Sequence, residues 1–511
     1  MILRNKRLII GAVATLILLG SYTAFIDNAY FSIGKSVYPE VSEQEALETV
    51  AYHLRKEQAI DISPHDMVAE LFVNADAERF LEVNGLLEQY TSNEHVPPIS
   101  MWKVSYYNWE YDLNSTYFVD MMTGDIVGFL DPFYYDESFQ DEAETDGINI
   151  AQEWLVERGI TDDYTYMKDE VNADDVVIHH FISKQPVAGD RPLLLKIYTL
   201  DGWFIGFYPK LDIPESDVTS PFIESLSSGL SIAVSFAYMG LIFIVGLIYW
   251  AMRGTDKSLS APIPILTGMV LVVTGMLMIT DIIGLMQGIA YGVLVFMAML
   301  AVYSKRNNLG SRSPERMAYL REKVLQGYLL GMITFLPSFV FYTIAENGFN
   351  AWGSSEDAFL MLEEAKWVML TPFLIGLFAA VSEEIMFRKF GEFVFKRVWN
   401  NQLFIALITS FIWSIGHLAY TVHPWYLRIV ELTFFVGPFL YWVYKKYGLT
   451  VAIMSHYLFN CISVSLTLMS FDADRYVYSL LYLLVPLVIY VIPAKRRKLT
   501  QTPGASTKTY T

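Results

Sequence analysis

The chain of 511 residues is almost free of cysteine, with Cys461 as the only one. A single cysteine excludes an intramolecular disulfide and any zinc cluster built from several thiolates. The His-Glu-x-x-His motif, which places two histidine ligands on one helix face, is also missing. After the first apolar segment, the stretch Tyr22–Ser32 lacks a small-x-small cleavage site, so we expect an uncleaved membrane anchor rather than a signal peptide.

Basic residues are scarce in one long part of the chain. From Asp27 to Gly229 the sequence has 39 Asp and Glu against 11 Lys and Arg, or −28, and the remainder has 15 against 25, or +10. Positive residues mark the cytoplasmic side of a membrane protein, and Arg4, Lys6 and Arg7 precede the first apolar segment. We therefore expect a cytoplasmic N-terminus and an acidic domain on the extracytoplasmic side.

Apolar residues are abundant: 53% of the chain is hydrophobic and 15% is aromatic, which is rich for a soluble protein. Runs of about 20 mainly apolar residues, the length of helix that crosses a bilayer, recur ten times. They are Leu8–Phe25, Leu230–Met252, Ile263–Ile283, Leu285–Tyr303, Leu329–Ile344, Val368–Phe387, Leu403–Ala419, Ile429–Tyr444, Thr450–Ser470 and Tyr478–Ile492. The predicted fold is an α-helical polytopic membrane protein of about ten transmembrane helices, with an inserted extracytoplasmic α+β domain. Alternating crossings then place the later basic loops and the C-terminus on the cytoplasmic side.

The acidic domain contains two similar halves. A helix predicted over Ser42–Gln58 from its capping box precedes a predicted hairpin over Met101–Leu130, and a second helix, Ile148–Arg158, precedes further strands. Both halves end alike, with GDIVGF at Gly124–Phe129 and GWFIGF at Gly202–Phe207. This order of elements resembles tandem PepSY-type modules, and duplication of an ordinary α+β unit is the alternative.

The stretch Thr371–Asn400 begins as an apolar membrane segment and places Glu383 and Glu384 side by side. An ionised carboxylate near the middle of a bilayer costs about 2.5 kcal/mol or more, so an adjacent pair without a use is hard to rationalise. Arg388 lies four residues after Glu384, on the same helix face, and is its expected partner. Glu383 is turned away by about 100° and is left to face a substrate or a water. A structural salt bridge within the membrane is the alternative interpretation.

Two further apolar segments carry polar groups. Trp413–His417 reads WSIGH, and Ser455–Asn460 reads SHYLFN, with His456 and Asn460 one helical turn apart. If the hairpin between the first two segments turns midway, His417 and the glutamate pair lie at nearly equal depth and can meet. A lone histidine on an apolar helix is usually satisfied by a neighbouring hydroxyl or carbonyl, but this many polar groups on three spans favours a functional site.

These segments resemble the CPBP intramembrane proteases, also called the CAAX-protease and bacteriocin-processing or Abi family, which are related to the Rce1-type prenyl-protein endopeptidases. The family pattern is Glu-Glu-x-x-x-Arg, then Phe-x-x-x-His, then His-x-x-x-Asn or His-x-x-x-Asp. The chain has the same three motifs in the same order, within about 371–470: Glu383-Glu384-Ile-Met-Phe-Arg388, Trp413-Ser-Ile-Gly-His417 and His456-Tyr-Leu-Phe-Asn460. Trp413 stands where the family prefers phenylalanine and still supplies an aromatic wall. The extracytoplasmic domain has no place in the family core.

The resemblance implies an intramembrane endopeptidase that hydrolyses peptide bonds of membrane-associated substrates with a water activated by Glu383. It implies that His417 is the second catalytic group, that His456 and Asn460 hold the oxyanion or help to bind a metal, and that Glu384 helps to position the first helix. The implied catalytic residues are Glu383, Glu384, His417, His456 and Asn460, with Arg388 and Trp413 in structural, positioning roles.

A zinc ion is the expected cofactor, with a glutamate-dependent reaction as the alternative, since the family has been described in both ways. The candidate zinc ligands are His417, His456 and Glu384. Two histidines and one carboxylate can hold Zn²⁺ and leave an open position for water. Their spacing does not decide between the two mechanisms, because the ligands come from separate helices.

Two other functions use the same helical core: a non-catalytic membrane regulator or sensor, and an ion-coupled transporter, which would also have to explain Glu431 in the next span. The expected partners are a membrane-associated protein or peptide substrate and the lipid bilayer, with no nucleic acid, because the basic stretch Ala301–Lys323 suits anionic headgroups. We expect a multi-pass protein of a bacterial cell membrane. The predicted division of the chain is an N-terminal anchor (1–28), an extracytoplasmic acidic α+β domain (29–227), transmembrane helices with a basic cytoplasmic loop (228–346), a CPBP-like protease core (347–494) and a cytoplasmic tail (495–511).

Overall fold

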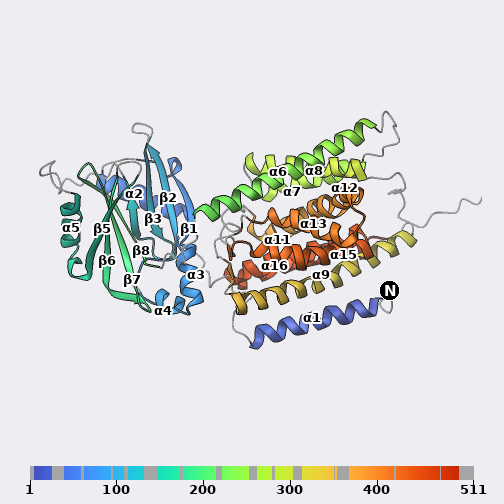
Figure 1. Ribbon diagram of the computed structural model, residues 1–511, viewed down its shortest axis with the longest axis horizontal. Coiled ribbons are helices and arrows are strands. Elements are labelled where there is room, and N and C mark those ends of the chain that lie inside the picture. Colours follow the sequence, from blue (N-terminus) through green and yellow to red (C-terminus); the bar gives the residue numbers. More distant parts are fainter. Residues whose placement is uncertain are drawn as a thin grey trace, which may run out of the picture.

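The computed structural model has two parts, a β-sheet domain with its helices and a bundle of long helices that lies beside one end of it (Figure 1). Helix α1 (Lys6–Phe25) comes first in the chain and packs against the bundle, the sheet domain follows, and the remaining bundle helices come last. The described residues are 5–25, 40–58, 62–93, 96–108, 113–131, 147–172, 176–213, 221–252, 262–278, 282–302, 314–349, 351–353, 367–418, 420, 422–471 and 473–493.

Eight antiparallel strands form one sheet in the order β1-β2-β3-β4-β8-β7-β6-β5. Their bounds are β1 (Val68–Val73), β2 (Ser100–Asn108), β3 (Leu113–Asp120), β4 (Ile126–Leu130), β5 (Tyr164–Val171), β6 (Val177–Ala188), β7 (Arg191–Leu200) and β8 (Trp203–Leu211). Each half of the sheet runs in chain order from its outer edge inward, and the two halves meet where β4 pairs with β8.

The repeated Gly-x-x-x-Gly-Phe signature lies at this junction. Phe129 pairs directly with Phe207, and Leu130 pairs with Gly206. A Cβ atom on Gly206 would lie 2.1 Å from the carbonyl oxygen of Phe129, and one on Gly128 would lie 3.0 Å from the carbonyl oxygen of Phe207. The second glycine of each signature therefore allows the backbones of the two halves to approach closely enough to form one sheet.

Helices α2 (Glu43–Gln58) and α5 (Gly147–Glu157) contribute to a single hydrophobic core with residues of both halves of the sheet. The capping box predicted for α2 is present, since the Ser42 amide donates to Glu45 Oε2 at 2.8 Å and the Glu45 amide donates to Ser42 Oγ at 3.3 Å. Trp154 of α5 is buried in this core against the ring of Phe204. Two short helices, α3 (Ala75–Val83) and α4 (Leu87–Thr91), help to form a second, smaller core.

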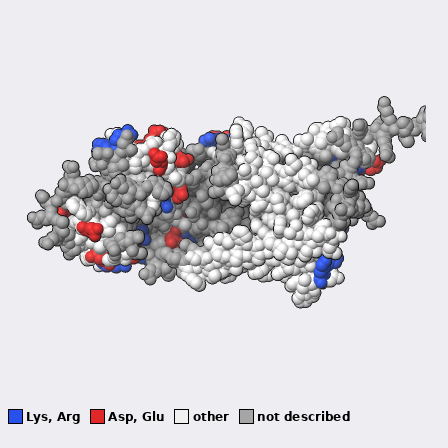
Figure 2. All heavy atoms as spheres, turned by 90° about the horizontal axis from the view of Figure 1, so that it is seen from above, with Lys and Arg blue, Asp and Glu red and all other residues white. Residues whose placement is uncertain are grey.

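The bundle consists of long apolar helices and a few short ones. They are α6 (Pro221–Met252), α7 (Pro262–Met278), α8 (Ile282–Val302), α9 (Pro314–Phe349), α11 (Thr371–Glu383), α12 (Gly391–Val398), α13 (Gln402–Ile415), α14 (Leu427–Glu431), α15 (Gly437–Tyr447), α16 (Leu449–Phe471) and α17 (Ala473–Tyr476). Two π-helical segments, Glu384–Phe390 and Leu432–Val436, join α11 to α12 and α14 to α15. Figure 2 shows charged side chains on the sheet domain and at the far end of the bundle, while the middle of the bundle is without charge on this face, as suits a surface in contact with lipid.

The structure is that of a polytopic helical membrane protein, but it does not support ten transmembrane helices. Among the described residues, six helical spans are long and apolar enough to cross a membrane: Ser225–Met252, Leu285–Val302, Pro314–Ala345, Val368–Val398, Leu427–Tyr447 and Leu449–Met469. Two predicted spans correspond to shorter apolar helices, Pro264–Met278 and Gln402–Ile415. The last predicted span is a 3₁₀ helix, Val477–Tyr490. Hydropathy detects an apolar run but not whether the run becomes one long α-helix.

The sheet domain touches the bundle through α3. A two-stranded sheet, β9 (Trp352–Gly353) with β10 (Val422–His423), joins the segment after α9 to the segment after α13. Arg79 of α3 donates from Nη1 to His423 Nδ1 at 2.7 Å, and Trp352 donates from Nε1 to Glu82 Oε2 at 2.7 Å. Burial raises the pKa of the Glu82 carboxyl, although the hydrogen bond from Trp352 partly opposes this shift. The two parts of the molecule are thus connected at the strand that follows α13.

His180, a buried histidine of β6, gives a prediction about acid stability. Burial, followed by Lys196 and Lys168, lowers the pKa of His180. Below the unfolded-state value of about 6.5 the unfolded chain binds a proton that the folded domain refuses, so stability should fall as the pH drops below that value, by up to about 1.4 kcal/mol per pH unit. We expect a fragment of residues 29–227 to fold alone, and urea unfolding of this fragment between pH 7.5 and 5 measures the effect.

His180→Gln should flatten this dependence, since it removes the titrating group. A fragment that is disordered by circular dichroism would refute independent folding of residues 29–227. An unchanged slope in His180→Gln would contradict the assignment to this histidine.

Candidate active site

The two adjacent glutamates lie where the helix changes type. Helix α11 ends at Glu383, and the π-helical segment begins at Glu384. The side chain of Glu384 is fully buried, whereas that of Glu383 is 17% exposed. Glu383 is therefore the more accessible of the two carboxylates, and that it faces a substrate or a water stays a prediction. Single π-helical turns within α-helices occur frequently at functional sites.

Glu384 is held by two partners. His456 Nδ1 lies 2.9 Å from Glu384 Oε1, and Arg388 Nε lies 3.5 Å from the same oxygen, which confirms the predicted pairing with Arg388. Arg388 is itself 1% exposed, and its guanidinium carbon lies 4.2 Å from the centre of the Trp413 ring. Within the described part of the chain, Glu384 Oε2 and both Nη atoms of Arg388 are buried without a hydrogen-bond partner. The pair is thus a buried ion pair with incomplete hydrogen bonding.

Trp413 contacts most of the site. Its indole Nε1 donates to Glu383 Oε2 at 2.6 Å. Its ring packs edge to face against the rings of His417, at 5.2 Å, and His456, at 5.8 Å. Sequence reasoning treated Trp413 as an aromatic wall and missed this hydrogen bond, although the departure from phenylalanine was a signal. A phenylalanine would keep the ring contacts but could not donate to the carboxylate.

His417 lies just beyond the end of α13. The hairpin turns near Asn400, between the end of α12 at Val398 and the start of α13 at Gln402, and Glu383 and His417 are each 15 residues from their end of the turn. His417 Nδ1 lies 2.9 Å from the carbonyl oxygen of Trp413. Because a carbonyl oxygen can only accept, Nδ1 carries the hydrogen, and Nε2 of the neutral ring is the atom that can accept a proton.

His456 lies between the two carboxylates. Its Nδ1 faces Glu384 as described, and its Nε2 lies 3.7 Å from Glu383 Oε2. Asn460 follows one turn later on α16 and is partly buried. Among the described residues, no hydrogen bond connects the Asn460 amide to the other predicted site residues. The structure therefore brings Glu383, Glu384, Arg388, Trp413, His417 and His456 together, and places Asn460 beside them on the same helix as His456.

A zinc ion that keeps an open position for water needs three ligands from the chain. Within the described residues, no group of three or more His, Cys, Asp or Glu side chains is placed to hold one. Of the predicted ligands, Glu384 and His456 are paired with each other, and His417 keeps Nε2 open while Nδ1 bonds the Trp413 carbonyl. Among the described residues, the side chains as arranged therefore do not present the three-ligand set of a zinc site.

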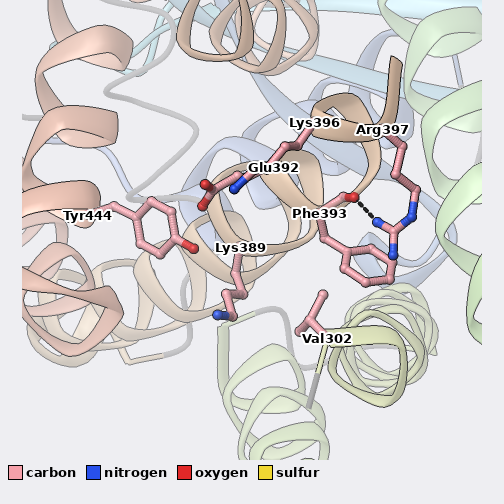
Figure 3. A pocket seen from close by; sticks show the side chains of 7 residues that line it. All are labelled: Val302, Lys389, Glu392, Phe393, Lys396, Arg397 and Tyr444. Carbon is pink, nitrogen blue, oxygen red and sulfur yellow. Dashed lines mark hydrogen bonds between the residues drawn. The ribbon is translucent and has the colours of Figure 1, made fainter. Parts of the chain in front are cut away.

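A basic recess lies where the end of the π-helical segment meets α12 (Figure 3). It has a volume of about 470 Å³ and is lined by Val302, Lys389, Glu392, Phe393, Lys396, Arg397 and Tyr444. None of the predicted catalytic residues lines it. Arg397 donates to the Phe393 carbonyl, as the dashed line marks, and Lys445 pairs with Glu392. The recess therefore belongs to the basic end of the bundle rather than to the candidate site.

Comparisons with known proteins agree with the motifs. Residues 365–462 match the family model described as type II CAAX prenyl endopeptidase Rce1-like, and this segment contains every predicted site residue. The predicted resemblance to the CPBP proteases is confirmed for this part of the chain: the molecule is a helical membrane protein in which residues 365–462 are similar to the Rce1-like CAAX proteases.

The chain is also similar to one curated protein over part of its length. Over 156 residues the chain is 23% identical to the sporulation-killing factor biosynthesis protein SkfC of Bacillus subtilis (strain 168). The match covers 27% of this chain and 31% of the relative, so the chain spans less than a third of that relative's length. No solved structure matches the chain.

Proposed function

We propose that the protein is an intramembrane endopeptidase that hydrolyses peptide bonds of membrane-associated substrates with a water activated by Glu383. The observation that carries the proposal is the placement of Glu383, an accessible carboxylate within a buried polar cluster of a protease-family domain. Its two described contacts, with Trp413 and His456, both use Oε2. The other oxygen, Oε1, would then accept the proton of the attacking water.

In the proposed reaction, the water oxygen attacks the carbonyl carbon of the substrate and one water proton passes to Glu383. The negative charge that develops on the carbonyl oxygen needs hydrogen-bond donors, for which the Asn460 amide is the candidate beside His456. His417, with Nε2 as its open nitrogen, would take this proton from Glu383 and deliver it to the leaving amine as the C–N bond breaks, which would return Glu383 to the carboxylate form. Glu384 and Arg388 would keep His456 in place through the bond from Nδ1.

The direct test is a comparison of membrane fragments from cells that carry the wild-type protein or Glu383→Gln. Proteomics should find peptides from a few membrane proteins only with the wild type, and their intact precursors should accumulate with the variant. A purified precursor should then be cleaved by the wild-type protein in vesicles. Identical fragment patterns in the two strains would count against the enzyme and in favour of a non-catalytic regulator. No observation on the described residues favours a regulator.

Zinc dependence is a separate prediction, which the zinc content of the purified protein tests. A metal-dependent reaction predicts about one zinc ion per chain after mild purification, and loss of this zinc in His417→Ala or His456→Ala. Elemental mass spectrometry of the purified protein gives the metal content without any activity assay. Full activity after exhaustive removal of divalent metals would instead favour the glutamate-dependent reaction.

We also propose that the sheet domain lies outside the cell membrane and that both termini and the basic recess lie inside, because positive residues mark the cytoplasmic side. A single cysteine at Gln89, exposed on α4, should react with an impermeant thiol reagent in intact cells, in a Cys461→Ala background. A cysteine at Val398, which is 78% exposed at the end of α12, should react only in inverted vesicles. The opposite labelling pattern would reverse the orientation.

A further inference from the structure

Glu431 is a second buried carboxylate of the bundle, outside the three family motifs. Glu431 is 2% exposed, and its carboxylate accepts three hydrogen bonds. Ser338 Oγ donates to Oε1 at 3.0 Å, Tyr342 OH donates to Oε2 at 2.9 Å, and Arg428 Nη1 donates to Oε2 at 2.8 Å. Since Ser338 and Tyr342 belong to α9, this carboxylate fixes the start of the α14–α15 helix to a different helix of the bundle.

From Glu431, contacts lead toward the candidate site. The guanidinium carbon of Arg428 lies 5.7 Å from the centre of the Tyr342 ring and 5.3 Å from that of Tyr420. The Tyr420 ring in turn lies nearly parallel to the imidazole of His417, with ring centres 5.8 Å apart and 12° between the planes. A row of contacts therefore runs from Glu431 through Arg428 and Tyr420 to His417.

His417 has reason to need such support. It lies after the last residue of α13, in a turn closed by the bond from its amide to the Ser414 carbonyl, and its ring has one described hydrogen bond, to the Trp413 carbonyl. The Trp413 ring packs edge to face against the imidazole, with ring centres 5.2 Å apart, and a contact from outside α13 adds to this restraint. Stacking by Tyr420 restrains the plane of the ring, and the positive charge of Arg428 over the Tyr420 ring holds the tyrosine in place.

The helix that carries Glu431 also packs directly on α13. The π-helical segment Leu432–Val436 begins right after Glu431, as the first π-helical segment begins right after Glu383. Leu432 and Val436 share a hydrophobic cluster with Trp413, and Ser414 Oγ lies 3.0 Å from Thr433 Oγ1. Anchoring Glu431 thus fixes both the support of His417 and the surface behind Trp413.

We infer that Tyr420 and Arg428, anchored by Glu431, are positioning residues that hold the His417 imidazole in the orientation needed for proton transfer. The inference rests on the proposed function for the role of His417. A purely structural role, in which Glu431 only neutralises Arg428, would not require any change at His417 when the carboxylate is altered.

The experiment compares Tyr420→Leu, Tyr420→Phe and Glu431→Gln with the wild-type protein in vesicles. Tyr426→Leu is the matched control, because Tyr426 is an exposed tyrosine of the same loop whose described ring contact is with Trp425. With a substrate found by the fragment comparison, kcat should fall about tenfold in Tyr420→Leu and Glu431→Gln while KM stays within about twofold. Tyr420→Phe keeps the stacked ring and should retain the wild-type kcat.

A second readout needs no activity. Diethyl pyrocarbonate modifies unprotonated histidine nitrogens, and peptide mass spectrometry gives the rate for His417 alone. We expect His417 to react several-fold faster in Tyr420→Leu and Glu431→Gln, and at the wild-type rate in Tyr420→Phe and Tyr426→Leu. The Tyr420→Leu result is decisive, since it removes the ring stacked on His417 and leaves Glu431, Arg428 and the surface behind Trp413 in place.

The outcomes separate this inference from the proposed function. If the wild-type protein cleaves nothing, the proposed function fails, and the modification rates still decide the positioning role. Wild-type rates at His417 in both Tyr420→Leu and Glu431→Gln would overturn it, as would a loss of activity that appears only in KM. If Glu431→Gln does not fold, the Tyr420 pair decides alone, because Tyr420 is 39% exposed and its replacement leaves the buried carboxylate intact.

Discussion

Replacing Glu383 with glutamine should abolish peptide-bond cleavage and leave the protein inserted and folded. The amide keeps the size of the side chain and can still accept the hydrogen bond from Trp413, which lies at 2.6 Å in the wild type. It cannot take a proton from water near neutral pH, so the attacking hydroxide is not generated. Loss of a general base typically costs about a hundredfold to ten-thousandfold in rate.

The neighbouring tryptophan gives a graded control for this result. Trp413→Phe keeps an aromatic ring against Arg388, His417 and His456 but removes the donor to Glu383. A hydrogen bond to a charged group contributes about 1.5 kcal/mol or more, so we expect roughly a tenfold loss of kcat. Cleavage of the purified precursor in vesicles measures both variants. Cleavage by Glu383→Gln at a near wild-type rate would contradict the proposed base.

Replacing Glu384 with alanine should instead destabilise the bundle. Glu384 is fully buried, and Arg388, at 1% exposure, would lose its partner while remaining inside the protein. Breaking a buried ion pair by removing one partner costs about 3–5 kcal/mol, because the remaining charge is uncompensated. His456 would lose its Nδ1 contact at the same time. We expect a clearly lower midpoint of thermal unfolding in detergent, measured by intrinsic fluorescence.

Two controls separate charge burial from a general effect of mutation. Glu392→Ala removes the partner of Lys445 on the same helical run, but this pair is partly exposed, so the expected loss is below about 1 kcal/mol. The double variant Glu384→Ala/Arg388→Met removes both charges and should recover part of the lost stability. Equal midpoints for Glu384→Ala and Glu392→Ala would contradict this account of the buried pair.

The sequence by itself determined which residues make up the candidate site. Charged and polar groups are costly in a membrane, so Glu383, Glu384, His417 and His456 stand out in apolar segments without any structural knowledge. The helical repeat paired Glu384 with Arg388, and counting residues from the hairpin brought His417 to the level of the glutamates. These inferences succeeded because they depend on local spacing and on the cost of burial, which a sequence shows directly.

Only the tertiary structure decided how these residues are arranged in space. The π-helical turn at Glu384, the bond from Trp413 to Glu383 and the row from Glu431 to His417 all depend on contacts between separate helices. The same holds for the junction of Phe129 with Phe207 and for the bond from Arg79 to His423, which joins positions 344 residues apart. The number of long transmembrane helices was wrong for a related reason: hydropathy reports whether a run is apolar, whereas its helix type and length depend on the neighbours against which it packs.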